Sequence, residues 1–109
     1  MLPAISVLDP KTVAATPVGP GCTRRDLIAP DGLRVWVVDI AAGAQWPHVD
    51  VHDAAGEVVY VVDGELIEGD RRICAGAYVV FGPGSRHQPR SDTGATLLGF
   101  NLTSQGAGL

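Results

Sequence analysis

The chain has 109 residues, of which 46% are hydrophobic and 18% are charged. This composition is typical of an ordered globular protein and excludes a disordered one. The formal net charge of −4 argues against nucleic acid or an anionic membrane as a partner, because both require a basic surface. No apolar stretch approaches the length of a membrane span, and the N-terminus has no signal-peptide pattern. We therefore expect a single cytoplasmic domain over residues 1–109.

The N-terminal segment is rich in proline, with Pro3, Pro10, Pro17 and Pro20 among its first twenty residues. Proline cannot donate a hydrogen bond within a sheet, so it is confined to edge strands, strand starts and bulges. We expect residues 1–20 to form an arm or edge strands, which wrap the domain or pair with a neighbouring subunit.

Several short segments rich in β-branched residues follow, separated by glycine and proline. Residues 33–40 predict a strand after a turn at 28–32, because Val, Ile and Trp are enriched in strands. Asp63-Gly64 is a typical hairpin signal after the run 57–62. No window of ten residues carries a helical pattern, so this series of short strands predicts an all-β sandwich or barrel. The other expected strands cover 46–52, 66–67, 72–74, 77–81 and 96–102.

The chain has only three histidines, and they occur with acidic residues in a pattern typical of a metal site. Alternation along a strand places His48, Asp50 and His52 on one face, which points inward in a barrel. Glu57 begins the next strand and His87 follows a Gly-Pro-Gly corner, so both can approach the same point. Nitrogen and oxygen ligands of this kind suit Fe, Mn, Ni, Cu or Zn, with coordination positions left for water or substrate.

Each of these residues also has a purely structural interpretation. A single histidine in a strand is more often a hydrogen-bonded core residue than a ligand. Asp50 and Glu57 can cap turns or pair with arginines. The set nevertheless favours a metal site, because its members share one face and a distant histidine, His87, completes it.

The same segment resembles the cupin superfamily, whose members carry two motifs separated by a variable hairpin. The first motif has the usual form G-x5-H-x-H-x(3,4)-E-x6-G, and its second half is matched by His52, Glu57 and Gly64. Asp50 stands where the first histidine of H-x-H is expected. Cupins are jelly-roll barrels, or double-stranded β-helices, and the resemblance implies this fold, with residues 43–94 as the motif region.

The second motif, G-x5-P-x-G-x2-H-x3-N, is matched in part. Gly76, Gly84 and His87 stand at its glycines and its histidine. Gly82 occupies the place of its proline, and Ser91 that of its asparagine. The second motif is therefore matched at its histidine, His87, and departs from the usual form at its proline and its asparagine.

Cupins usually hold one divalent metal through three histidines and one glutamate, so the resemblance implies His52, Glu57 and His87 as ligands. Asp50 in place of the remaining histidine leaves three alternatives. Asp50 replaces the missing ligand, a shifted strand brings His48 to the metal, or the metal is absent and the polar cluster performs acid–base chemistry. His48, Asp50 and His87 also match the H-x-D…H triad of non-haem Fe(II) oxygenases, although those that use 2-oxoglutarate are usually much longer.

The expected cavity walls follow from the same alternation of side chains. The inward residues should be Val59 and Val61, with either Trp36 and Val38 or Val35 and Val37. Trp46, Tyr78, Phe81 and Phe100 are candidates for the mouth, although core packing is the more usual role of any one aromatic residue. An apolar pocket with a few polar groups fits a small, largely apolar carbonyl compound, and does not fit a phosphate-rich one.

Within the superfamily, the chain is especially similar to the cupin domain of singlet-oxygen-sensing anti-sigma factors. The similarity lies in segments 56–65, 75–80 and 83–91. That domain in turn resembles free-standing cupins that cleave diketones or act in polyketide tailoring. We do not expect an anti-sigma role, because no zinc-binding helical module accompanies the barrel.

We expect an enzyme that acts on a small carbonyl metabolite by metal-assisted or acid–base chemistry, as a lyase, dehydratase, cyclase or oxygenase. The candidate catalytic residues are His48 as general acid or base, Asp50 to orient or charge-stabilise it, and Glu57. The alternative is a non-catalytic ligand-binding or sensor module. A homodimer is also expected, because an open sheet edge has to be covered.

Overall fold

The computed structural model describes residues 3–51 and 56–102. Apart from one 3-10 turn, η1 (Pro10–Thr12), the regular structure is all β, as predicted. The strands are β1 (Thr16–Gly19), β2 (Cys22–Leu27), β3 (Leu33–Ile40), β4 (Asp50–Val51), β5 (Glu57–Glu68), β6 (Arg71–Cys74), β7 (Tyr78–Phe81), β8 (Arg86–His87) and β9 (Ala95–Leu102). No helix in the two described ranges is long and apolar enough to cross a membrane.

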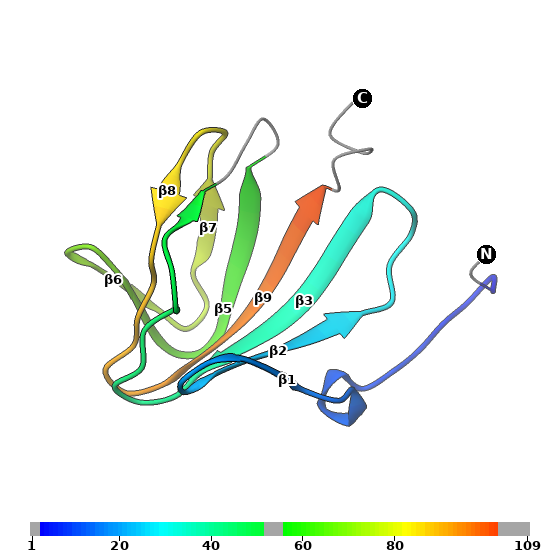
Figure 1. The fold of residues 1–109 in the computed structure, drawn as a ribbon. Helices are drawn as coiled ribbons and strands as arrows, with labels where there is room; N and C mark the ends of the chain where they lie inside the picture. Colours follow the sequence, from blue (N-terminus) through cyan, green and yellow to red (C-terminus); the bar gives the residue numbers. More distant parts are fainter. Residues whose placement is uncertain (1–2, 52–55, 103–109) are drawn as a thin grey trace.

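The strands form one large antiparallel sheet and one small ladder. The large sheet has the order β1-β2-β3-β9-β5-β6, with β7 paired to β5 beside this path. The small ladder consists of β4 and β8. The large sheet curls toward this ladder, so that the two layers enclose an interior (Figure 1).

Strand β5 bends midway along its length. Its first half pairs with β9 and β7, and its second half pairs with β6. The register shifts between Val61 and Asp63. Beyond this bulge, the backbones of Ile67 and Arg90 exchange two hydrogen bonds, which link β5 to the segment that leads away from β8.

The predicted hairpin at Asp63-Gly64 is therefore wrong, because the chain runs through these residues as one strand. Gly64 has a φ of +75°, and a side chain there would collide with the carbonyl group of Gly94. The glycine thus permits a bend and a close approach of two backbones. A bulge and a tight turn use the same residue type, so the local sequence does not separate them.

The strand expected over 46–52 is much shorter in the structure. Pro47 and His48 form a bend, and regular pairing begins only at Asp50. Strand β2 is absent from the predicted set, and β8 is the strand on which His87 was expected to reach the site, although no bounds were predicted for it. The sequence of β2 is Cys-Thr-Arg-Arg-Asp-Leu, in which charged residues hide the strand pattern.

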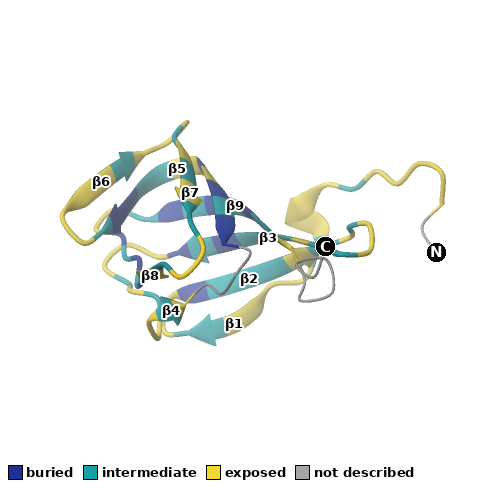
Figure 2. Cartoon of the chain, turned by 90° about the horizontal axis from the view of Figure 1, so that it is seen from above, coloured by how far each residue is buried: buried dark blue, intermediate teal, exposed yellow. Residues whose placement is uncertain are grey.

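The core lies on the concave side of the large sheet (Figure 2). Alternate residues of β3, β5 and β9 are buried there, which places Trp36 and Val38 inside in preference to Val35 and Val37. Tyr60 is 41% exposed and points outward, as strand parity requires. Tyr78 is also exposed, and Phe100 lies on the outward parity of β9, so neither of these two candidates lines the cavity.

Candidate functional site

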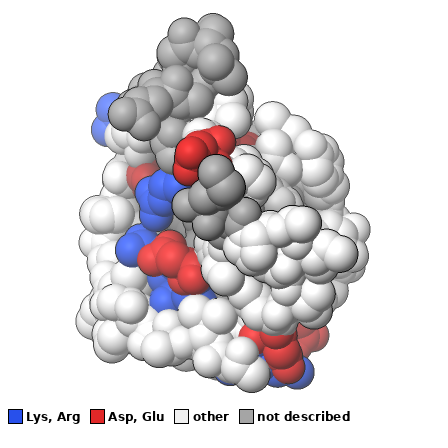
Figure 3. Space-filling model, turned by 90° about the vertical axis from the view of Figure 1, so that its right-hand side faces the viewer, with Lys and Arg blue, Asp and Glu red and all other residues white. Residues whose placement is uncertain are grey.

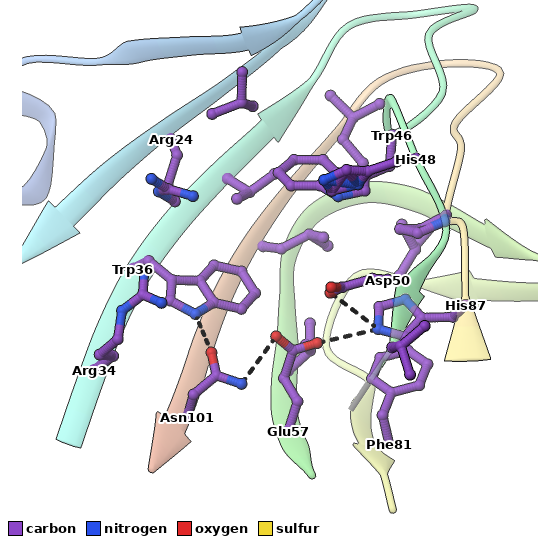
Figure 4. Close-up of a pocket in the computed structure, with 18 of the residues that line it drawn as sticks. Arg24, Arg34, Trp36, Trp46, His48, Asp50, Glu57, Phe81, His87 and Asn101 are labelled. Atoms are coloured by element: carbon purple, nitrogen blue, oxygen red, sulfur yellow. Dashed lines mark hydrogen bonds and ion pairs between the residues drawn. The ribbon is translucent and has the colours of Figure 1, made fainter. Parts of the chain in front are cut away.

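The interior holds a cavity of about 710 Å³ between the curled sheet and the β4–β8 ladder. Its floor is apolar, with Trp36, Val38, Val59 and Leu97 among the lining residues. Trp46 and Phe81 line it too, as expected for two of the four aromatic residues considered from the sequence. The polar side chains gather in two groups at different ends, as Figure 4 shows.

The first group is formed by Asp50, Glu57 and His87, which come from β4, β5 and β8. One donor atom from each of the three residues lies within 4.8 Å of the others. His87 Nε2 is 3.3 Å from Glu57 Oε2 and 3.5 Å from Asp50 Oδ2. The side chains of His87 and Glu57 are each only 6% exposed, whereas that of Asp50 is 36% exposed.

The β4–β8 ladder explains how two of these residues meet. Asp50 and His87 are paired across its two antiparallel strands. Residues directly opposite in such a ladder place their side chains on the same face, with Cβ atoms about 4.5–5.5 Å apart. Glu57 approaches from β5, whose alternation of Glu57, Val59 and Val61 faces the interior. Three strands thus bring one nitrogen and two carboxylates to one point, with His87 thirty residues after Glu57 in the sequence.

The imidazole of His87 is held on two further sides. The ring of Phe81 stacks on it, with centroids 3.9 Å apart and an interplanar angle of 9°. Glu68 Oε2 lies 3.8 Å from His87 Nδ1. At 3.8 Å this carboxylate is too far for a hydrogen bond, so it acts on the imidazole through its charge. An imidazole lone pair and two carboxylates repel one another unless a cation or a proton lies between them.

A chain of hydrogen bonds orients the carboxylate of Glu57. Trp36 Nε1 donates to Asn101 Oδ1 over 2.7 Å, and Asn101 Nδ2 donates to Glu57 Oε1 over 3.2 Å (Figure 4). The other oxygen of Glu57 is the one that faces His87. This arrangement fixes the plane of the carboxylate and leaves one oxygen directed at the cluster.

The structure places the other two histidines differently. His48 lines the same cavity but is exposed, and its ring meets that of Trp46 edge-on at a centroid distance of 6.1 Å. It is not a member of the three-residue cluster found among the described residues. His52, which the cupin resemblance implies as a ligand, lies outside the described residues.

Sequence reasoning missed four polar residues of this region, namely Asn101, Glu68, Arg24 and Arg34. Asn101 was detectable in principle, because it shares strand parity with the buried Ala95 and Leu97 of β9. Arg24 lies on a strand that was not predicted, so no inward face was available for it.

Gly99 provides the space in which the Trp36 indole lies. The two residues are direct cross-strand partners in β3 and β9, and a Cβ at position 99 would overlap the indole ring. Gly99→Ala should therefore displace Trp36 and destabilise the fold by about 1–3 kcal/mol, the usual cost of overpacking a core. Urea unfolding monitored by tryptophan fluorescence measures this change.

Gly82→Ala is the matched control. No atom lies within 4 Å of a Cβ built at Gly82, and its φ is not positive. Its effect should stay within about 0.5 kcal/mol, as for other surface substitutions. Equal stability of the two variants would contradict the packing of Trp36 on Gly99.

The comparisons with known proteins agree with this architecture. Residues 4–105 match the family model described as the ChrR cupin-like domain. No curated protein sequence matches the chain significantly.

Solved structures that resemble the chain are cupins of low sequence identity, which shows the common fold. An RmlC-like cupin from Shewanella frigidimarina is 20% identical, with a TM-score of 0.76 and 97% of each chain covered. The polyketide cyclase RemF from Streptomyces resistomycificus is 15% identical, with a TM-score of 0.75 over 90% of this chain and 79% of that one. The anti-sigma factor complex of SigE and ChrR from Rhodobacter sphaeroides gives 18% identity and a TM-score of 0.75 over 84% of this chain and 49% of that one.

Proposed function

This chain belongs to the family of ChrR cupin-like domains, and we propose that it is a small metal-dependent enzyme that acts on a carbonyl-containing metabolite. The observation that carries the proposal is the convergence of Asp50, Glu57 and His87 at one end of the cavity. A carbonyl compound that enters the cavity meets these three residues beside an apolar wall. Lyase, dehydratase, cyclase and oxygenase chemistry are all compatible with such a site.

The donor set fits the divalent metal that the cupin fold implies. Two carboxylate oxygens and one imidazole nitrogen suit Fe, Mn, Ni, Cu or Zn. In this proposal Asp50, Glu57 and His87 hold the metal, and His52 is a fourth ligand, as the motif implies. A metal bound there polarises a substrate carbonyl or stabilises an enolate oxygen.

Other residues of the chain orient the site and handle protons. Asn101 holds Glu57, and Phe81 with Glu68 holds His87, so neither ligand needs to reorganise when the substrate binds. His48 lies at the exposed rim, from which an imidazole can exchange protons with both solvent and substrate. The apolar floor, which includes Trp36, Val38 and Val59, limits the access of water to the reacting atoms.

Metal analysis tests the ligand assignment. The purified protein should bind one divalent metal per chain, and His87→Ala or Glu57→Gln should weaken that binding more than about 100-fold, beyond the effect typical of outer residues. Asp70→Asn, in the exposed turn between β5 and β6, should leave metal binding unchanged. Elemental analysis after dialysis against Fe(II), Mn(II) or Zn(II) gives the stoichiometry, and thermal unfolding verifies that each variant is folded. Undiminished metal in folded His87→Ala would refute the assignment.

Turnover of a substrate panel tests the reaction class. β-Diketones, hydroxy-aldehydes and polyketide-like phenols should include at least one compound that the metal-loaded protein converts. His48→Ala should lower kcat by roughly 10²–10⁴, the contribution of a general acid or base, without loss of metal. Loss of metal in this variant would make His48 a ligand instead, and full turnover with metal bound would remove it from the mechanism.

A ligand-binding or sensor module is the second candidate, favoured by the family match to the ChrR cupin-like domain. The same panel separates the two candidates. A compound that binds in the cavity and is recovered unchanged, with no panel member converted, would favour the sensor.

We also propose that a second copy of the chain covers the outer face of β5 and β7. Val62, Tyr78 and Val80 on this face are 50%, 67% and 61% exposed, and Tyr60 is the cross-strand partner of Tyr78. Residues 3–9, with the exposed Ile5 and Val7, extend away from the barrel in Figure 1. An apolar sheet face and an apolar arm on the same molecule form a self-complementary pair of surfaces, as a two-fold dimer requires.

Light scattering after size exclusion tests the dimer. The unmodified chain should have the mass of two copies, and Tyr78→Lys or Val80→Lys should reduce it to one, because burying an unpaired ammonium group in an interface is costly. Ile28→Lys, at a 56% exposed apolar site in the turn after β2, should leave the mass of a dimer. A monomeric unmodified chain would refute the proposal.

A further inference from the structure

Two arginines line the cavity at a distance from the proposed metal ligands. Arg24 of β2 and Arg34 of β3 are both among the lining residues. Arg24 shares strand parity with the buried Cys22, and Arg34 shares it with the buried Trp36. The inner surface of a small barrel is usually apolar, because a charge placed there must be paired. Two guanidinium groups on this surface therefore need a counter-charge, from the protein or from a ligand.

One carboxylate accompanies the pair. Asp26 Oδ1 lies 3.3 Å from Arg24 Nε and 3.6 Å from Arg34 Nη2. Among the described residues, Arg24 Nε is buried and has no hydrogen-bond partner, so its contact with Asp26 is an ion pair without hydrogen-bond geometry. The group of two arginines and one aspartate carries one excess positive charge. On the face shown in Figure 3, basic and acidic side chains lie together in a hollow.

The two arginines are accessible to a ligand. Their side chains are 33% and 53% exposed, and each guanidinium carries five N–H donors, more than one carboxylate can satisfy. Planar guanidinium groups bind carboxylates in a bidentate manner. A single excess charge matches a monoanionic carboxylate better than a dianionic phosphate ester.

The distance between the two arginines and the Asp50–Glu57–His87 cluster indicates how long a ligand that contacts both must be. Three strand spacings separate β2 from β5 through β3 and β9, or about 14 Å along the curved sheet at 4.8 Å per spacing. In Figure 4 Arg24 and Arg34 lie across the cavity from Asp50 and His87, and the Trp36 indole lies between the two groups. A ligand that reaches both ends therefore crosses an aromatic surface.

We propose that Arg24 and Arg34 form a carboxylate-binding subsite, so that the substrate is an oxo or hydroxy acid whose reactive carbonyl group is several carbon atoms from its carboxylate. This inference rests on the proposed function of the Asp50–Glu57–His87 cluster and names its substrate class. It adds one anionic group to the largely apolar carbonyl compound expected from the sequence, because two arginines line one end of the cavity. Asp26 serves as the internal counter-ion that the substrate carboxylate displaces.

Calorimetric titration with straight-chain oxo acids, from 4-oxopentanoate to 8-oxononanoate, and with their methyl esters tests the subsite. The metal-loaded protein should bind at least one acid about tenfold or more tightly than its ester, because hydrogen bonds to a charged partner are the strong ones. Arg24→Gln and Arg34→Gln should each remove most of this preference. Arg71→Gln, on the exposed strand β6, is the matched control and should keep it.

Asp26→Asn gives an independent result that does not depend on removing an arginine. It releases both guanidinium groups from their counter-ion, so it should strengthen acid binding and leave ester binding unchanged. Weaker acid binding in this variant, equal binding of acid and ester by the unmodified protein, or tighter binding of inorganic phosphate than of any acid would overturn the subsite. Metal content separates this failure from that of the proposed function, because the arginine variants should retain the metal that His87→Ala loses.

Discussion

The bend of β5 is the constraint on which the site depends. A straight strand would separate the ends of β5, Glu57 and Glu68, by roughly 36 Å, at about 3.3 Å for each of eleven steps. Yet both carboxylates lie within 4 Å of the same imidazole, Glu57 at Nε2 and Glu68 at Nδ1. This is achieved because the register shift after Val61 and the positive φ of Gly64 bend the strand toward the segment after β8, where Ile67 pairs with Arg90. A single strand therefore supplies both Glu57, a member of the cluster, and Glu68, the carboxylate on the other side of its histidine.

Strand β5 also illustrates which features of the fold the sequence can predict, namely the alternation of its side chains, and which it cannot, namely its bend. Alternation along β5 predicts Glu57 and Val59 inside the barrel, because strand parity is a local property. Along β3 the same alternation leaves two faces open, and only the structure shows that Trp36 and Val38 are the buried pair. The cupin resemblance singles out Glu57 and His87, which do lie together. The interpretation of Asp63-Gly64 as a hairpin fails, because the bulge there is stabilised by contact with Gly94, a residue thirty positions away.

The polar residues that sequence reasoning missed have a common physical origin. Asn101 and Arg34 acquire their roles through inter-strand pairing, which the sequence of one strand does not encode. Arg24 requires both an unpredicted strand and its pairing with β3. Asp50 was identified as a candidate from alternation over 46–52, although regular pairing starts only at Asp50 itself. Its position opposite His87 in the β4–β8 ladder is the more direct reason for its contact with the cluster.

The charged side chains of the cavity form two groups, one acidic and one basic, at opposite ends. The packing of the strands between the two groups sets the distance between them. Asp50, Glu57 and Glu68 surround one imidazole, so acidic side chains predominate at this end, and the cation of the proposed site would stabilise their arrangement. The other end, at Arg24 and Arg34, has more guanidinium groups than carboxylates.

Trp36 connects the two ends. It follows Arg34 on the same face of β3, and it donates to the asparagine that holds Glu57. The absence of a side chain at Gly99 lets the indole lie against β9, so one glycine fixes the wall along which an elongated anion would lie. In this geometry a negatively charged ligand has one favoured orientation, with its anionic group at the arginines and its uncharged carbonyl group at the acidic cluster. The cavity thus selects orientation by charge before any contact with the reacting atoms is made.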